Sequence, residues 1–235
     1  MFSRDRAAQL DALLTSVRDH AGWLWPPVVL YASSDEEFAA GYRRLAQLQR
    51  LHPVPDTPLK QKLLESIDPK VPLTTFLVDD AIFYRPFPEV TSVDAGTAFA
   101  PRLGKNCTYC YPLDRTQREG ELDFLYFFSV DGHVYRTEEI LPRMQAAEFS
   151  TPNQLEDALS HSDPLKVLYN EHSCLVGIPH NRVGEYDNRH AGGSPRELNA
   201  RFLKGERIDP ASMDFSHVIG AHQEIEYVWK PEKKV

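Results

Sequence analysis

Two adjacent carboxylates, Asp79 and Asp80, directly follow a short apolar run and are the residues best placed to do chemistry. Residues 74–78 are β-branched, aromatic or aliphatic without polar alternation, which predicts a strand buried on both faces. Ligands of open α/β sheets bind beyond the carboxyl ends of the strands. Carboxylate oxygens are also the ligands that Mg²⁺ and Mn²⁺ prefer. The pair therefore predicts a metal site, with simple capping of a turn as the alternative.

Groups that could hold phosphates occur in two further segments. Arg4 and Arg6 precede a predicted helix, whose N-terminus attracts anions, and Ser3 is expected to cap that helix. Farther along, Arg102 and Asn106 flank a glycine that lets backbone approach a ligand, so they could hold a diphosphate or sugar hydroxyls. A solvated basic turn and a basic surface loop are the respective alternatives.

The elements around these residues predict an α/β architecture. Leu10, Leu13, Leu14 and Val17 recur at helical spacing, and residues 28–32 have the composition of a strand. Helices and strands then alternate as far as the acidic pair. This order predicts a parallel, right-handed α/β half that resembles a nucleotide-binding half-domain.

A β-hairpin is predicted after this half. Residues 124–130 are largely aromatic and apolar, and Asp131-Gly132 supplies the positive φ angles of a tight turn before residues 133–135. The hairpin would add a small antiparallel element. Asp131 could line an acceptor pocket, although turn chemistry alone would also explain it.

The segments FSRDRAAQLDALLTSV and FLVDD resemble GT-A-fold glycosyltransferases of the family-2-like kind. In that fold a polar loop with Arg precedes a helix reading QLxxLL, and an Asp-x-Asp-type metal motif ends a central strand. The resemblance implies an α/β sandwich with a mostly parallel central sheet flanked by helices and a small antiparallel element. Two departures are visible: only Met1 and Phe2 stand where the first strand is expected, which fits a truncated or a misassigned start, and the acids read Asp-Asp-Ala rather than Asp-x-Asp.

The resemblance also implies how a single domain of residues 1–235 would be divided. Residues 1–110 would form the nucleotide-binding half and residues 111–235 the acceptor-binding half. The residues expected to bind the nucleotide sugar are Ser3, Arg4, Arg6, Asp79, Arg102 and Asn106.

A metal site is the second implication of the resemblance. Asp80, with Asp79 beside it, would hold Mn²⁺ or Mg²⁺ between the protein and the donor diphosphate. His180 resembles by position the C-terminal His that completes this site in many GT-A enzymes, and His217 and His222 are rivals.

The catalytic base is the third implication. Glu156 and Asp157 resemble the x-Glu-Asp motif that follows the metal motif, in which one acid deprotonates the acceptor hydroxyl. Asp131 is a further candidate in the acceptor half. The alternative for the pair is that acids near a helix N-terminus are favoured by the helix dipole alone.

The sequence therefore predicts a metal-dependent glycosyltransferase that moves a sugar from a UDP- or GDP-linked donor to a carbohydrate or other hydroxyl acceptor with inversion, as in polysaccharide biosynthesis. A sugar-phosphate nucleotidyltransferase is one alternative, but it normally has a glycine-rich phosphate loop, which FSRDRAA lacks. A non-catalytic carbohydrate- or partner-binding member of the same fold is the other.

Composition excludes several other classes. The 235 residues include 42% hydrophobic and 26% charged residues, an ordinary globular balance, and no apolar run approaches the length of a membrane span. The net charge of −8 argues against nucleic-acid and anionic-membrane surfaces. Cys107, Cys110 and Cys174, without a signal peptide, fit buried thiols in a reducing cytoplasm, with a redox pair as the alternative.

Overall fold

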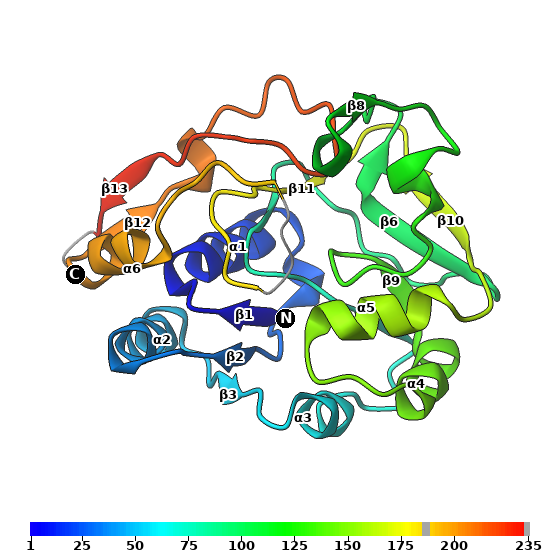
Figure 1. The fold of residues 1–235 in the computed structure, drawn as a ribbon, viewed down its shortest axis with the longest axis horizontal. Coiled ribbons are helices and arrows are strands. Elements are labelled where there is room, and N and C mark those ends of the chain that lie inside the picture. The colour runs from blue at the N-terminus through cyan, green and yellow to red at the C-terminus, as the bar shows by residue number, and fades with distance from the viewer. Residues whose placement is uncertain (185–188, 233–235) are drawn as a thin grey trace.

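The computed structural model describes residues 1–184 and 189–232, and it is an α/β structure with two main sheets (Figure 1). The first sheet has three parallel strands in the order β1-β2-β3. These strands and the helices that follow them are β1 Phe2–Arg4, α1 Ala7–His20, β2 Leu30–Ala32, α2 Glu36–Gln49, β3 Val54–Pro55 and α3 Leu59–Glu65. The predicted α/β class is confirmed.

The second main sheet has four strands in the order β10-β6-β9-β4. They are β4 Leu73–Thr75, β6 Thr97–Gly104, β9 Val134–Arg136 and β10 Lys166–Asn170. Only the β10–β6 pair is parallel, whereas β9 is antiparallel to both of its neighbours. The predicted mostly parallel arrangement therefore holds for the three-stranded sheet, and the larger sheet is mixed.

The apolar run before the acidic pair connects the two sheets. Thr74 and Thr75 belong to β4 and pair with β9, while Val78 forms a parallel bridge with Phe2 of β1. The backbone N–H of Phe2 also donates to the carbonyl of Leu77 at 2.9 Å. The acids that follow are consequently held at the junction of the two sheets.

The remaining elements are short and include three small antiparallel pairs, β11–β5, β12–β13 and β7–β8. The strands are β5 Ala81–Phe83, β7 Tyr109–Cys110, β8 Arg115–Thr116, β11 Leu175–Gly177, β12 Glu206–Ile208 and β13 Trp229–Pro231. The helices are α4 Thr137–Ala146, α5 Pro152–Ser160 and α6 Pro195–Leu203, with 3₁₀ turns at Gly22–Leu24, Tyr111–Leu113, Leu122–Leu125 and Pro210–Ser212. Figure 1 shows α6, β12 and β13 beside α1 and α2, so the chain returns to its N-terminal elements.

The main core forms around α1. Leu10, Leu13, Leu14 and Val17 are fully buried, as their helical spacing predicts, and α1 lies against β5, α2 and α6. A second cluster combines aromatic and aliphatic side chains of both main sheets and of α3, α4 and α5, and in it Phe76 contacts Phe2 at a centroid distance of 6.1 Å. These two clusters hold the strand ends at which the predicted site residues lie.

The predictions for the first residues were wrong. Ser3 does not cap a helix but lies in β1, and its hydroxyl hydrogen-bonds Tyr42 at 2.6 Å. The cap of α1 is Arg6, without a side-chain hydrogen bond. The first strand, for which the sequence offered only Met1 and Phe2, is β1, and it includes the polar residues Ser3 and Arg4. These residues can form a strand because pairing with β2 and Val78 supplies the backbone hydrogen bonds.

The predicted hairpin was also wrong. Residues 124–130 contain no strand: a 3₁₀ turn covers Leu122–Leu125, and after it Phe127 and Phe128 pack against the core while Tyr126 is exposed. Phe128, for example, stacks on Tyr135 at 5.3 Å. β9 pairs instead with β4 and β6, so burial of aromatic rings rather than strand pairing explains the composition of this run.

Other sequence expectations are met. Cys107, Cys110 and Cys174 are free and buried. None of the helices among the described residues combines the length and the apolar character needed to cross a bilayer.

We expect Leu13→Ala to lower the free energy of unfolding by about 2 to 5 kcal/mol, because Leu13 is 0% exposed in the centre of α1 and its removal leaves a cavity. Urea denaturation followed by circular dichroism measures this change. The control is Leu125→Ala, whose side chain is 65% exposed and should change stability by less than about 0.5 kcal/mol. Equal losses in the two variants would contradict the assignment of α1 to the core.

Candidate functional site

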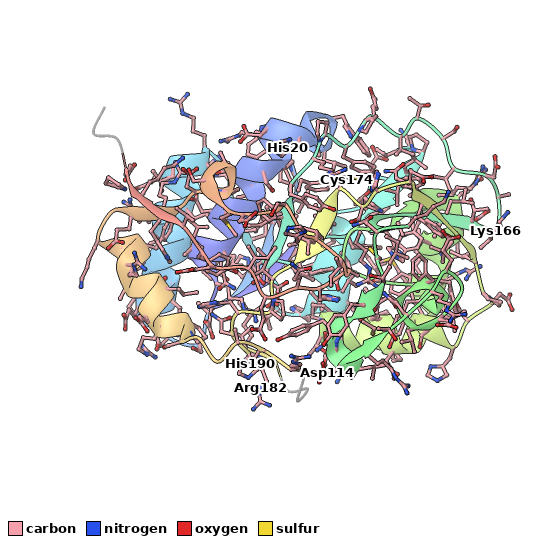
Figure 2. The ribbon with its side chains drawn as sticks, turned by 90° about the horizontal axis from the view of Figure 1, so that it is seen from above. His20, Asp114, Lys166, Cys174, Arg182 and His190 are labelled. Carbon is pink, nitrogen blue, oxygen red and sulfur yellow. The ribbon has the colours of Figure 1, made fainter. Side chains whose placement is uncertain are left out.

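Most of the predicted site residues line one large cavity of about 1030 Å³. They are Ser3, Arg4, Arg6, Asp79, Asp80, Arg102, Asp131 and Glu156. Arg182 and His190 also line it, and Figure 2 shows both near Asp114 at one edge of the molecule. Residues from both main sheets and from the loops after them thus meet in a single cavity.

Arg6 is the centre of the first charged cluster in this cavity. Its Nη1 donates to Asp79 Oδ1 and to Asp80 Oδ2, both at 3.0 Å. Its Nε donates to Asn181 Oδ1 at 2.7 Å, and its Nη2 donates to the Asn181 carbonyl. Burial alone would lower the pKa of Arg6, but the two carboxylates raise it, so the guanidinium stays charged.

The two acids of the pair differ in how many of their oxygens are occupied. Asp79 is buried and gives Oδ1 to Arg6 and Oδ2 to the backbone N–H of Arg4 at 3.1 Å. Burial raises the pKa of Asp79 to about 6, against the pull of Arg6 and with a contribution from Asp80. Asp80 gives Oδ2 to Arg6 and is more exposed, with 19% of its side chain accessible. Asp79 therefore acts as a structural partner, and Asp80 faces the cavity with one oxygen available.

A turn that depends on a glycine positions Asp131. Gly132 has φ of +99°, and its N–H donates to the carbonyl of Phe76 at 2.7 Å. A Cβ atom at this position would lie 2.3 Å from a methyl carbon of Leu175. Both the backbone conformation and the close contact therefore require glycine immediately after Asp131.

Asp131 is the acceptor of the second charged cluster. Its Oδ2 accepts from Arg102 Nη1 and from His222 Nε2, each at 3.1 Å. Burial would raise the pKa of Asp131, but the His222 hydrogen bond and the Arg102 charge lower it to about 2. Burial alone would lower the pKa of His222, but the hydrogen bond and the charge of Asp131 outweigh burial, so the pKa of His222 is raised. Asp131 is therefore ionised and held in one orientation.

Glu156 projects from α5 into the same cavity. Its Oε1 accepts the N–H of Val130 at 3.3 Å, which places it beside the Asp131 turn. Burial, followed by the charge of Asp131, raises the pKa of Glu156. A carboxyl group with a raised pKa is a better base near neutral pH than Asp131.

Three predicted residues do not line the cavity. Asp157 is exposed on α5, and its carbonyl accepts from Ser160 and His161. Asn106 is used structurally, since its side chain bonds Ser173 and the Val218 carbonyl. The ring of His180 lies against Tyr227 at 4.8 Å.

Two residues contribute to these clusters in roles that the sequence did not predict. Asn181, which had no assigned role, binds Arg6 through its side chain and its carbonyl, and His222, a rival candidate for the metal site, binds Asp131. Neither lies in a recognised motif, so their proximity to the site depends on long-range packing. The polar, glycine-rich composition of residues 181–193 predicts a loop that closes over a substrate, and positions 185–188 of this segment lie outside the described residues.

The carboxylates are better suited to a metal ion that binds together with a substrate than to a metal ion held by protein side chains alone. The described residues contain no group of three or more His, Cys, Asp or Glu side chains that could hold an ion. Asp80 Oδ1, however, has no hydrogen-bond donor among the described residues, because Arg6 engages only Oδ2. Mg²⁺ in proteins is commonly held by one or two carboxylates together with substrate phosphates. A single carboxylate oxygen with a donor diphosphate is compatible with that pattern.

Comparisons of the chain with models of protein families, with curated proteins and with solved structures found no match. The case for a function therefore depends on the chemistry of the cavity. That chemistry consists of one acidic cluster neutralised by Arg6 and one carboxylate cluster organised by Arg102 and His222.

We expect Arg6→Met to lower the free energy of unfolding by about 3 kcal/mol at pH 8, because it leaves two buried carboxylates without their cation. The loss should be smaller at pH 5. The folded-state pKa of Asp79 is already about 6, and removal of Arg6 raises it further. At pH 5 the carboxyl group is protonated in the folded variant, whereas at pH 8 it must ionise, so stability falls as the pH rises through the folded pKa.

Urea denaturation at both pH values measures this difference. Arg43→Met is the control, since Arg43 pairs with Glu36 on the surface and its removal should cost less than about 1 kcal/mol at either pH. A loss in Arg6→Met that does not depend on pH would show that the carboxylates are not the source of the effect.

Proposed function

We propose that this protein is a GT-A-type glycosyltransferase that moves a sugar from a UDP- or GDP-linked donor to a hydroxyl of a carbohydrate or other acceptor. The observation that carries the proposal is that Asp80 and Glu156, far apart in the sequence, line the same cavity. Such a reaction needs charge stabilisation at the leaving diphosphate and a base at the attacking hydroxyl. A cavity of about 1030 Å³ is large enough for a nucleotide sugar together with part of an acceptor.

Asp80 would serve the leaving-group side of the reaction. Its free Oδ1 would hold Mn²⁺ or Mg²⁺ together with the donor diphosphate, and the bound ion would neutralise charge that develops as the diphosphate leaves. Arg6 fixes the other oxygen and so orients the carboxylate. Arg4, exposed at the carboxyl end of β1, is available to the phosphates or the base of the nucleotide.

Glu156 would serve the acceptor side. One of its oxygens would take the proton of the acceptor hydroxyl as that oxygen attacks the anomeric carbon, and attack opposite the leaving diphosphate gives inversion. Its raised pKa suits a base at neutral pH. Asp131, ionised and bound to Arg102 and His222, would orient the acceptor rather than remove the proton.

A non-catalytic binding protein of the same fold is the second candidate. The observation that favours it is the complete use of Arg6: its nitrogens donate to four oxygens of Asp79, Asp80 and Asn181, so the acidic pair is stable without a metal ion. The same cavity would then bind a saccharide without cleaving a donor. Both candidates are consistent with action in the cytoplasm, which the free, buried cysteines support.

Calorimetric titration of UDP and GDP, with and without Mn²⁺, tests the proposed function directly. We expect one of the nucleotides to bind more tightly with Mn²⁺ by about tenfold or more, and we expect Asp80→Asn to abolish this metal dependence, because Asp80 Oδ1 provides the protein ligand. Asp163→Asn, an exposed acid elsewhere, should bind as the unmodified protein does. Folded protein that binds neither nucleotide would refute the glycosyltransferase proposal and favour the saccharide-binding candidate.

We expect Glu156→Gln to lower kcat by about 10²- to 10⁴-fold while leaving nucleotide affinity nearly unchanged, because the variant keeps the shape of the side chain and loses the base. Release of UDP or GDP from a panel of nucleotide sugars measures kcat. Asp157→Asn is the matched comparison on the same helix. A larger loss in Asp157→Asn than in Glu156→Gln would reverse the assignment of the base.

A further inference from the structure

Arg102 is a buried arginine with few hydrogen-bond partners. It lies in β6, is 4% exposed and lines the cavity. Its Nη1 donates to Asp131 Oδ2 at 3.1 Å. Its Nε is buried without a hydrogen-bond partner, and its Nη2 has none among residues 1–184 and 189–232. Most of its five N–H donors are therefore unused by the protein.

The other buried arginine of the cavity, Arg6, differs in this respect. Each nitrogen of the Arg6 guanidinium donates to an oxygen of the protein. An unsatisfied buried donor costs free energy, and the cost is greater for a charged group. Arg102 thus carries a cost that Arg6 does not, and a ligand acceptor that reaches Nη2 from the cavity would offset part of it.

The neighbours of Arg102 leave most of its donors without an acceptor. The oxygen that it contacts, Asp131 Oδ2, is also the acceptor of His222 Nε2 at 3.1 Å. The cluster therefore places two donors on one carboxylate oxygen. Arg102 lies in β6 of the four-stranded sheet, whereas the β1–β3 strand ends, where a nucleotide would bind, belong to the other main sheet.

We propose that Arg102 binds the carboxylate of an acidic sugar in this cavity. A guanidinium presents its N–H groups in a planar fork that matches a carboxylate, and this pairing is stronger than a hydrogen bond to a neutral hydroxyl. The inference rests on the proposed function for the saccharide nature of the ligand. The acid can belong to the donated sugar or to the acceptor, and the two sources present the same group to Arg102.

Titration of a matched pair of sugars tests the inference. Methyl glucuronide and methyl glucoside differ at C6, where one has a carboxylate and the other a hydroxymethyl group. We expect the unmodified protein to bind the glucuronide at least about tenfold more tightly, as measured by calorimetry or ligand-observed NMR. The ratio of the two affinities should fall to about one in Arg102→Met. Part of the preference should be retained in Arg102→Lys, which keeps the positive charge but not the planar fork of N–H groups.

Two controls separate this site from general effects. Arg43→Met removes an exposed arginine outside the cavity and should keep the full preference. Circular dichroism and thermal unfolding check that each variant is folded, since Arg102→Met leaves Asp131 with His222 alone. If Arg102→Met does not fold, Arg102→Lys decides, because it keeps a cation beside Asp131 and should still lose most of the preference.

The remaining outcomes distinguish the inference from the proposed function. The inference is wrong if the unmodified protein shows no preference, if the preference survives in Arg102→Met, or if that variant loses UDP and GDP binding while keeping the preference, which would assign Arg102 to the diphosphate. Loss of the preference with unchanged nucleotide binding supports both proposals. An Arg102-dependent preference in a protein that binds neither UDP nor GDP supports the acidic subsite and refutes the transferase.

Discussion

The ion pairs of Arg6 with Asp79 and Asp80 are the interaction on which the cavity depends. They connect three distant parts of the chain: the loop after β1, the turn after the apolar run, and the segment at Asn181. Because Arg6 and Asp79 are buried, neither could lose its partner without leaving an uncompensated charge. The same contacts leave one oxygen of Asp80 facing the cavity, so the interaction that stabilises the loop also determines which carboxylate is available for chemistry.

The two charged clusters of the cavity serve different purposes. In the first, the protein satisfies its own cation completely, and the available group is an acceptor on Asp80. In the second, two donors share Oδ2 of Asp131, and the groups without a hydrogen-bond partner among the described residues are Asp131 Oδ1 and most of the donors of Arg102. The cavity thus offers carboxylate oxygens that can bind a cation and guanidinium nitrogens that can bind an anion, a combination suited to a ligand with separate charged parts.

The sequence predicted the elements whose periodicity is strong and the segments that carry the charged groups. The spacing of Leu10, Leu13 and Leu14 predicted the buried face of α1. The apolar run before Asp79 and Asp80 was predicted as one buried strand, but β4 covers only Leu73–Thr75 of it, and Val78 bridges to β1 instead. β1 was missed because a three-residue strand containing Ser3 and Arg4 has no periodicity of its own and depends on its neighbours for pairing. The contacts of Asn181 and His222 were likewise not predictable, since each is made across a long sequence separation.

The glycine after Asp131 has a consequence for how the protein can change over evolution. Gly132 is held in a positive-φ conformation and in close contact with Leu175 of β11, so any side chain there would displace the turn that carries Asp131. A lineage that keeps the carboxylate in the cavity must also keep the glycine beside it and a side chain at position 175 that leaves room for the turn. Positions 131, 132 and 175 are therefore expected to be conserved together or lost together, although of the three only Asp131 lines the cavity.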